Sequence, residues 1–256
     1  MASLDSMSKD TLAGYLGSTD KKFGEAKLKA RKHIENHPGF VAFSGGKDSM
    51  VALHLALQTD PNIPVCFYDS GVEFPENIAY IHHIANVYNL NLEIIEAKPS
   101  VLDILRKEAY FDHKRMPVEL KVSLIDAKIT IPSEKAHEKY GKGRIWGLRS
   151  EESKGRSMLL NSRNGEFLSA KGEYVTAPIW NWSSSQVFAY LSKHNIPENP
   201  LYAKMRALGV EEKGLRVGSI IDGSNLDYGR VTWLKRGWPE IYDRLRIALP
   251  RLEEFR

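Results

Sequence analysis

"FVAFSGGKDSMVALHLAL", residues Phe40–Leu57, is the stretch that decides the fold. Its first four residues form a continuous apolar run, which predicts a strand buried on both faces. After the two glycines, the spacing of apolar residues in "MVALHLALQ" predicts a helix. A strand, a glycine turn and a helix in direct succession are typical of an α/β protein with a parallel sheet.

The same alternation continues along the chain. "IPVCFYDSG" and "LNLEIIEA" predict two more strands, with a helix over "PENIAYIHHIANVYN" between them. "RIWGLRSEES" predicts a strand and a polar loop, "YVTAPIWNW" an extended segment, and "SSSQVFAYLSKHNI" a helix capped by Ser183 or Ser184. We therefore expect a parallel twisted sheet flanked by helices, of the Rossmann-like kind.

Both ends of the chain are expected to add to this sheet. Residues 20–37 have the pattern of an amphipathic helix that Pro38 and Gly39 end. The stretch from Asn199 to Arg256 mixes short helical patterns with glycine-rich loops. The expected division is an N-terminal helical extension over 1–38, a nucleotide-binding domain over 39–202, and an irregular C-terminal extension over 203–256.

Composition limits the class of protein. The chain has 256 residues, of which 42% are hydrophobic and 27% charged, and a net charge of +4. No apolar stretch reaches the roughly 20 residues that cross a bilayer, so we expect a cytoplasmic protein without a membrane partner. Cys66 is the only cysteine, which excludes an intramolecular disulfide and a four-cysteine cluster.

The glycine turn after the first strand is suited to phosphate. A strand that ends in two glycines and leads into a helix presents backbone N–H groups, and the helix dipole adds positive charge there. Asp48 would repel a bare phosphate, so its presence suggests a bridging Mg²⁺. The turn is neither a Walker A loop nor GxGxxG. The candidate phosphate-binding residues are Ser44, Gly45, Gly46, Lys47, Asp48 and Ser49.

The hexapeptide SGGKDS resembles the PP-loop of the adenine nucleotide alpha hydrolase superfamily, whose ATP pyrophosphatases carry SGGxDS after the first strand. The resemblance implies that the loop grips the pyrophosphate part of ATP. It also implies attack on the α-phosphate, giving an AMP adduct and pyrophosphate. ATP and Mg²⁺ are then the expected cofactors, with Lys47 and Asp48 catalytic and Asp48 at the metal.

Further motifs resemble the phosphoadenylyl-sulfate (PAPS) reductase-like branch of that superfamily. "YDSGVEFPEN" is similar to a signature that lines the adenosine pocket, and implies nucleotide binding by Asp69 and Gly71; Asn77 replaces its final Thr. "GLRSEESKGR" is similar to the arginine loop of the branch. That likeness implies nucleotide binding by Gly147 and Arg149, and catalytic roles for Arg149 and Arg156. "PIWNWSSSQVFAYL" and "NPLY" complete the likeness, with Gln186 where Asp is usual.

Several of these residues have a structural alternative. Asp69 either binds the nucleotide or stabilises its own turn, and each arginine either clamps phosphate or pairs with Glu151 or Glu152. Glu73 and Glu76 either cap the second helix or serve chemistry. Trp180, Trp182 and Tyr202 are expected in the core or in pocket walls, and Cys66 as a small buried residue of a strand.

The cysteine count separates two chemistries. Sulfonucleotide reductases of this branch use a C-terminal cysteine nucleophile, and here "GLRVGSIIDGSNLDYGR" contains none. The likeness is therefore greatest to the ATP pyrophosphatase of bacterial DNA phosphorothioation that has no iron–sulfur cluster. That likeness implies DNA as acceptor, a cysteine desulfurase as sulfur donor, and further subunits of the modification system.

Residues outside the loop also bear on a DNA partner. Lys135–Lys171 contains nine Lys or Arg against four Asp or Glu, and we expect this stretch, with Lys204 and Arg206, to follow a DNA backbone. A solvated basic face is the alternative. Rival functions are PAPS or adenylyl-sulfate reduction, nucleotidyl transfer to a small molecule as in FAD synthases, and nucleotide sensing without turnover.

Overall fold

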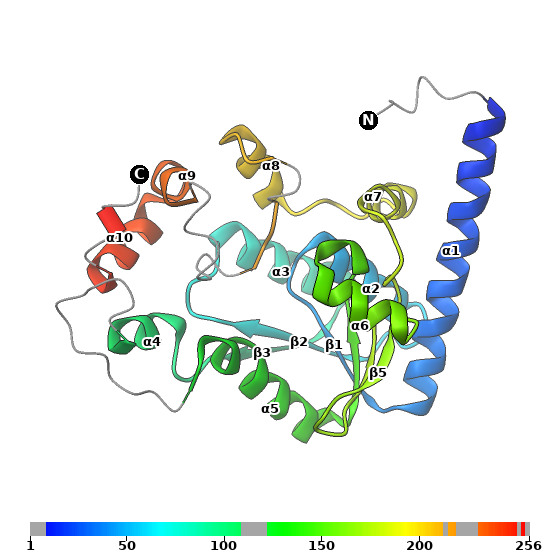
Figure 1. Cartoon of the computed structure of the whole chain (residues 1–256), viewed down its shortest axis with the longest axis horizontal. Helices are drawn as coiled ribbons and strands as arrows, with labels where there is room; N and C mark the ends of the chain where they lie inside the picture. Colours follow the sequence, from blue (N-terminus) through cyan, green and yellow to red (C-terminus); the bar gives the residue numbers. More distant parts are fainter. Residues whose placement is uncertain (1–8, 109–121, 212–214, 219–229, 250–251, 254–256) are drawn as a thin grey trace. The chain divides into compact units, whose positions relative to one another are not determined.

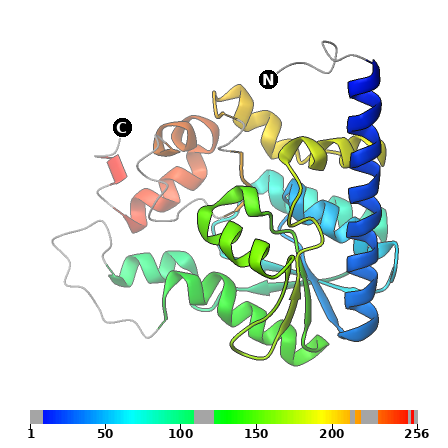
Figure 2. The ribbon, with the colours of Figure 1, turned by 45° about the vertical axis from the view of Figure 1, so that its right-hand side comes forward.

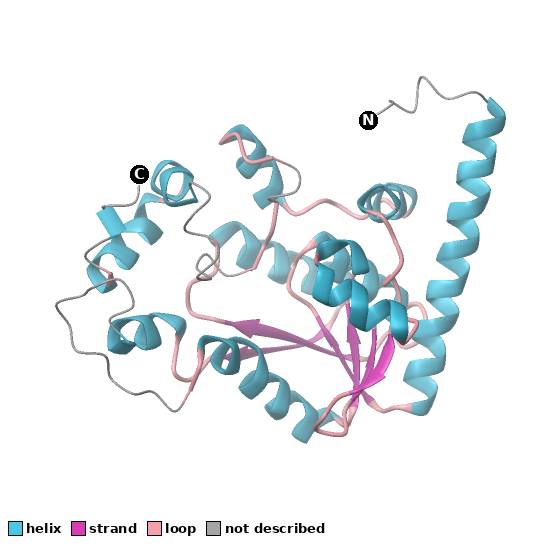
Figure 3. Cartoon of the chain, viewed as in Figure 1, coloured by secondary structure: helices cyan, strands magenta, loops and turns pink. Residues whose placement is uncertain are grey.

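Six strands form one sheet in the computed structural model of the chain, which describes residues 9–108, 122–211, 215–218, 230–249 and 252–253. The sheet order is β3-β2-β1-β4-β6-β5. The pairs β2–β3, β1–β4 and β4–β6 are parallel, and β5–β6 is antiparallel. Helices flank the strands (Figures 1 and 3), so the predicted α/β fold is confirmed. The strands are β1 (Gly39–Ala42), β2 (Pro64–Asp69), β3 (Asn91–Glu96), β4 (Gly143–Trp146), β5 (Glu166–Leu168) and β6 (Tyr174–Thr176).

The described helices include every helix expected from the sequence. The longest begins at Lys9 instead of Asp20. The helices are α1 (Lys9–Asn36), α2 (Lys47–Leu57), α3 (Pro75–Tyr88), α4 (Val101–Glu108), α5 (Ile131–Tyr140), α6 (Lys154–Ser162), α7 (Ser184–Lys193), α8 (Pro200–Ala207), α9 (Arg230–Gly237) and α10 (Pro239–Ala248). A π-helical turn, η2 (Asp126–Thr130), precedes α5, and a 3₁₀ turn, η3 (Ser150–Glu152), precedes α6.

Helix α7 shows why the sequence departs from its motif at Gln186. Ser183 is the N-cap, and its side chain accepts a hydrogen bond from the backbone N–H of Gln186. The Gln186 side chain in turn accepts from the backbone N–H of Ser183 at 2.9 Å. This is a capping box, in which glutamine at the third helical position does what a carboxylate would do. The predicted cap at Ser183 is confirmed.

The chain divides into two compact units that alternate along the sequence. Unit 1 comprises residues 1–42, 47–63 and 140–197, and unit 2 comprises residues 43–46, 64–139 and 198–256. The glycine turn is shared, with residues 43–46 in unit 2 and the start of α2 in unit 1. The domain division expected after residues 38 and 202 stays a prediction.

Unit 1 has its core between α1, α2, α7 and the strands β1 and β4. Helix α1 packs against α2 and β4, and Figure 2 gives a second view of α1 within this unit. An aromatic group joins α1 to α7, because the Phe23 ring lies 4.8 Å from that of Trp182 and 4.9 Å from that of Tyr190. Burial of these rings fixes the segment before α7, which carries part of the candidate site.

Unit 2 has a separate core formed mainly by α4, α8, α9 and α10, together with the start of α3. Phe74 and Trp238 are buried there with their rings 4.6 Å apart. Glu76 links three helices or their ends, since it accepts from Lys204 Nζ at 2.6 Å and from Trp238 Nε1 at 2.7 Å. Among the described residues, no helix is long and apolar enough to cross a membrane.

Candidate functional site

The neighbouring strands β1 and β4 are parallel, and both lead directly into predicted site residues. After β1 the chain turns away to β2, while β4 pairs on the opposite side of β1. The order of the strands in the sheet therefore reverses between β1 and β4. Open α/β sheets bind ligands at such a point, at the carboxyl ends of the strands. Lys47 and Asp48 begin the helix after β1, and Arg149 follows β4 by three residues.

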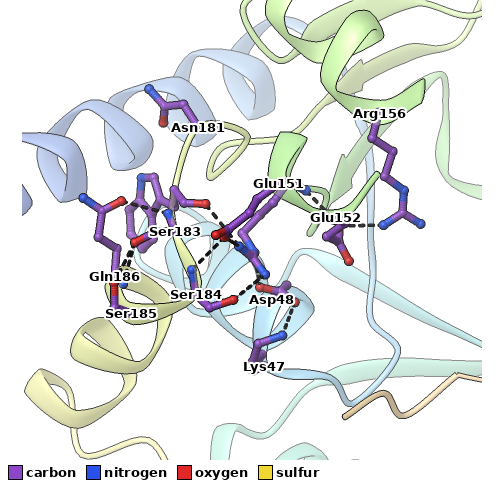
Figure 4. A network of polar contacts seen from close by, with 12 residues as sticks. Lys47, Asp48, Glu151, Glu152, Arg156, Asn181, Ser183, Ser184, Ser185 and Gln186 are labelled. Carbon is purple, nitrogen blue, oxygen red and sulfur yellow. Dashed lines mark hydrogen bonds and ion pairs between the residues drawn. The ribbon is translucent and has the colours of Figure 1, made fainter. Parts of the chain in front are cut away.

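Asp48 lies between two cations in unit 1. Its Oδ2 accepts from Lys47 Nζ at 2.9 Å (Figure 4), and its Oδ1 accepts from Arg149 Nε at 2.6 Å. The side chains of Lys47 and Asp48 are 15% and 14% exposed, so this ion pair is largely shielded from water. The structure therefore brings together three residues predicted to be catalytic.

Arg149 is almost fully enclosed by protein acceptors. Its Nη1 donates to Glu151 at 2.5 Å and to the Trp182 carbonyl at 3.2 Å, and its Nη2 donates to Ser184 Oγ at 3.0 Å. Burial acts to lower the pKa of Arg149, but Asp48 and Glu151 outweigh it and raise that pKa, so the charge is permanent. Arg149 thus makes the carboxylate pairing that the sequence left as an alternative, and it orients Asp48.

Arg156 has a different environment. Its Nη1 donates to Glu152 Oε2 at 2.5 Å, and its side chain is 40% exposed, against 4% for Arg149. Glu152 also accepts from the backbone N–H of Arg149 at 3.0 Å, so one carboxylate links the two arginine positions. Of the two arginines, Arg156 is the one that an incoming phosphate can reach without displacing buried contacts.

Gly147 allows β4 and α2 to approach each other closely. A Cβ at this position would lie 2.5 Å from the backbone nitrogen of Ser49 and 2.6 Å from the Asp48 carbonyl carbon. Any other residue would push the arginine loop away from the start of α2. The predicted residues Gly147 and Ser49 are therefore brought together, in a backbone contact that requires glycine.

In unit 2, two buried amides hold the glycine part of the loop. Asn77 Nδ2 donates to the Ser44 carbonyl at 3.1 Å, and Asn199 Nδ2 donates to the Gly45 carbonyl at 3.0 Å. The two amides also bond to each other, Asn199 Nδ2 donating to Asn77 Oδ1 at 2.8 Å. We call this pair, Asn77 with Asn199, the amide bridge.

The amide bridge was not predicted, although both residues stand in motifs that the sequence shows. Asn77 is 0% and Asn199 2% exposed. Gly45 has φ +78°, and a Cβ on it would lie 2.2 Å from Asn77 Oδ1, so both backbone conformation and space require glycine. By binding two loop carbonyls, the bridge engages negative ends of dipoles that would otherwise oppose an anion. The replacement of Thr by Asn at position 77 was the available signal.

Asp69 and Gly71 form a tight turn after β2. The Oδ1 of Asp69 accepts from the backbone N–H of Gly71 at 2.8 Å, which is the turn-stabilising role left open by the sequence. Next to it, Glu73 accepts from Ser70 Oγ at 2.6 Å. Burial, with a smaller contribution from Asp69, raises the pKa of Glu73 to about 7. The cap residue of α3 is Phe74, which makes no side-chain capping bond.

The described residues do not form a magnesium site by themselves. Both oxygens of Asp48 are bound by cationic side chains, and no group of three or more His, Cys, Asp or Glu suited to a metal occurs in the described ranges. Mg²⁺ is commonly held by one carboxylate together with substrate phosphates and water. The role of Asp48 as a metal ligand stays a prediction.

Cys66 lies inside β2 and is 1% exposed, which confirms its expected burial. Burial, followed by the negative charge of Glu93, raises the pKa of the Cys66 thiol to about 12. A thiol in this state carries almost no thiolate near neutral pH, so it is a poor nucleophile.

The cations expected to follow DNA are partly engaged within the chain. Lys204 binds Glu76, and both terminal nitrogens of Arg206 bind Glu198 at 2.8–2.9 Å. Arg144 is 6% exposed and its guanidinium lies 4.4 Å from the Trp146 ring centre. The basic stretch is therefore not uniformly a solvated face.

Comparison with known proteins decides the family. A model of the phosphoadenosine phosphosulfate reductase domain matches residues 38–231. The chain belongs to this family. A phosphoadenosine 5'-phosphosulfate reductase of Cronobacter sakazakii is 31% identical over 207 residues, covering 78% of this chain and 81% of the relative. One of Yersinia enterocolitica is 32% identical over 173 residues, covering 66% and 68%. The predicted PAPS reductase-like, nucleotide-binding class is confirmed.

Solved structures of low sequence identity share the fold. A PAPS reductase from Candida auris in a phosphate complex has a TM-score of 0.56 at 17% identity, covering 84% of this chain and 96% of that one. A Candida glabrata FMN adenylyltransferase in complex with ATP has a TM-score of 0.51 at 16% identity, covering 73% and 58%. Yeast FAD synthetase in complex with FAD reaches 0.54 at 14% identity, covering 96% and 81%.

Proposed function

We propose that the chain is an ATP pyrophosphatase that adenylates an acceptor. The carrying observation is the phosphate loop itself: the amide bridge binds the carbonyls of Ser44 and Gly45, and Lys47 and Asp48 follow after Gly46. A loop with its carbonyls bound and a helix N-terminus behind it favours an anion, and Lys47 adds a full positive charge. The substrate is Mg·ATP, in which the metal arrives with the phosphates.

In the proposed reaction, an acceptor oxygen attacks the α-phosphorus of ATP. A bond forms between that oxygen and phosphorus, the bond from the α-phosphorus to the bridging oxygen breaks, and pyrophosphate leaves. Lys47 neutralises charge that develops on the leaving pyrophosphate, and Arg156 is the accessible cation for the remaining phosphate. Asp48, oriented by Arg149, fixes the position of Lys47 through the 2.9 Å contact.

We further propose a DNA backbone phosphate as acceptor, activated so that sulfur can replace oxygen. The sulfur is the outer atom of a persulfide on a partner cysteine desulfurase. It attacks the activated phosphorus, AMP leaves with the replaced oxygen, and a thiol reductant supplies the two electrons that cleave the S–S bond to the desulfurase. Two observations support an external sulfur donor: Cys66 is the only cysteine of the chain, and its thiol is buried with a pKa near 12. A thiol that carries sulfur between proteins must be accessible and readily ionised.

PAPS reduction is the second candidate, because the curated relatives named above are PAPS reductases. That reaction needs a cysteine nucleophile, and the state of Cys66 argues against one in this chain.

The test is incubation of the chain with Mg²⁺ and α-labelled ATP, with and without single-stranded DNA and a cysteine desulfurase supplied with labelled cysteine. The proposal expects pyrophosphate release that depends on Lys47, and sulfur label in DNA only in the complete mixture. A parallel reaction offers PAPS with a dithiol reductant. Sulfite production there, without pyrophosphate release from ATP, would replace the proposal by the reductase alternative.

A further inference from the structure

Helix α6 is weakly buried for its position beside the candidate site. Of its residues only Leu160 is buried, in a small cluster with Leu148 and Ala177. Met158 is 76% and Leu159 38% exposed. A helix in a globular domain normally buries a stripe of apolar residues. Here two large apolar side chains stay outside, which leaves a surface suited to a partner.

The same helix carries Lys154 and Arg156, and its C-cap residue is Arg163. Lys154 and Arg163 are exposed, and neither forms an ion pair within the part of the chain that the structure describes. No Asp or Glu occurs from Ser153 to Gly165. Lys204 and Arg206, by contrast, have carboxylate partners. The positive charge of α6 is thus available to a partner that carries phosphate.

The exposed cationic and apolar side chains of α6 and its C-cap follow one another in the order cation, apolar, apolar, cation. Lys154 and Met158 are four residues apart, as are Leu159 and Arg163, so each cation lies beside one apolar side chain. At 3.6 residues per turn the two pairs are about 140° apart around the helix axis, so a strand that contacts both must run obliquely over α6. Arg163 is the C-cap residue, and Lys154 to Arg163 extends about 13 Å along the axis. We call these four side chains, Lys154, Met158, Leu159 and Arg163, the α6 surface.

The α6 surface is continuous with the arginine loop. Ser153 caps α6 and directly follows η3, whose residue Glu152 holds both Arg149 and Arg156. Figures 2 and 4 show α6 leading out of that loop within unit 1. A chain bound along α6 would therefore extend from the accessible Arg156 in the first turn of the helix.

We propose that the α6 surface binds the acceptor strand as single-stranded DNA, with Lys154 and Arg163 on phosphates and Met158 and Leu159 against bases. The inference rests on the proposed function and assigns its acceptor a place. A single strand offers phosphates and exposed base faces side by side, whereas a duplex encloses its base faces. An acidic polypeptide would satisfy the cations but not the two apolar side chains.

The test measures binding of a labelled 20-nucleotide strand by fluorescence anisotropy across a salt series, using the full chain. Lys154→Ala with Arg163→Ala is compared with Lys32→Ala, an exposed cation of α1. We expect roughly tenfold weaker binding at low salt for the double variant, and a salt slope smaller by about 1.4, from two lost phosphate contacts. Lys32→Ala should leave both values unchanged.

The apolar side chains of the α6 surface are tested with a separate pair of variants. Met158→Ser with Leu159→Ser should weaken single-strand binding without changing the salt slope, while Val87→Ser, on exposed α3 surface, should not. Thermal unfolding checks that every variant is folded. Wild-type affinity in the double charge variant, or displacement of DNA by polyglutamate at matched charge concentration, would overturn the proposal.

A separate titration with a non-hydrolysable ATP analogue tests nucleotide binding independently of DNA binding by the α6 surface. The α6 variants should bind the analogue as the wild type does. If no variant and no wild-type chain binds the analogue, the proposed function fails, while the DNA arms still decide whether the α6 surface binds a single strand.

Discussion

Asp48 matters at the scale of single residues because it is the counterion of a buried guanidinium. Arg149 is 4% exposed, and of its hydrogen-bonded partners Asp48 and Glu151 are carboxylates. Removing one partner of a shielded pair leaves the other charge poorly compensated, which costs more than an exposed pair would. Replacing Asp48 should therefore change both stability and catalysis, and the two effects can be measured separately.

Asp48→Asn should lower the free energy of unfolding by about 2 kcal/mol and slow pyrophosphate release roughly a hundredfold. Urea denaturation and a coupled pyrophosphate assay measure the two effects. The matched control is Glu35→Gln, which breaks the exposed pair between Arg31 and Glu35 on α1 and should change stability by less than about 0.5 kcal/mol. Equal stability of the two variants would remove Asp48 from the structural role.

The Cys66 thiol should be unreactive in the native chain. With its pKa raised to about 12 and its side chain 1% exposed, the thiol should resist iodoacetamide in the native chain up to about pH 9, where a free cysteine near pKa 8.5 reacts. Cys66→Ala should retain pyrophosphate release and sulfur incorporation, and lose about 1 kcal/mol of stability. Loss of sulfur transfer alone would make Cys66 a persulfide carrier.

At the scale of elements, the phosphate loop depends on residues far from it in sequence. The amide bridge joins the loop to the start of α3 and to the start of α8, where Asn199 Oδ1 also accepts from the Leu201 N–H at 3.0 Å. Because Asn77 and Asn199 are buried, a lost donor leaves a loop carbonyl without its partner. The loop conformation is thus set by packing within unit 2.

Asn199→Asp keeps the size of the side chain but removes both Nδ2 hydrogen bonds, and places an acidic group near Asn77 Oδ1. We expect a loss of about 3 kcal/mol in stability at pH 8 and a raised KM for ATP. Asn181→Asp is the control, since Asn181 is exposed and it is its backbone carbonyl that accepts a hydrogen bond from Lys22 Nζ. A normal KM together with lost stability would limit the amide bridge to folding.

For the whole molecule, the sequence was informative wherever a pattern is local. The strand before the glycines, the helices over "MVALHLALQ" and "PENIAYIHHIANVYN", and the capping box at Ser183 all follow from spacing within a few residues. Contacts between distant residues were not predictable. The ion pair of Lys204 with Glu76, and the pairing of Asn77 with Asn199, depend on which helices pack together, and a single sequence does not show that.

The antiparallel strand β5 and helix α6 were missed for a related reason. β5 has three residues with no buried member, and α6 buries one residue, so neither has the apolar periodicity on which the prediction depends. The same lack of burial leaves apolar side chains of α6 exposed on the surface of the molecule. A segment without a core pattern can therefore be a regular element whose apolar side chains serve a partner.

Global stability should depend on pH through three titratable groups whose pKa values burial shifts, Glu73, His33 and His54. Burial raises the pKa of Glu73 to about 7, from 4.5 for the exposed group. Between these pH values the folded chain binds the proton and the unfolded chain has released it, so this group's contribution to stability falls as pH rises from about 4.5 to 7. His33 and His54 act oppositely, because burial lowers their pKa values to about 4, and their contribution falls as pH drops below 6.5.

The difference between the free energies of unfolding of Glu73→Gln and wild type, followed against pH, separates the contribution of Glu73 from that of the histidines. Glu73→Gln keeps an acceptor for Ser70 Oγ and cannot ionise. Its free energy of unfolding relative to wild type should therefore rise between pH 4.5 and 7, and level off at pH 8 on the order of 3 kcal/mol above its value at pH 4.5. Urea denaturation at half-unit pH steps gives the difference curve, and Glu25→Gln on exposed α1 surface serves as control. A flat difference curve would mean that Glu73 has the same pKa in the folded and unfolded chains, with the effect of burial offset by neighbours such as Lys128.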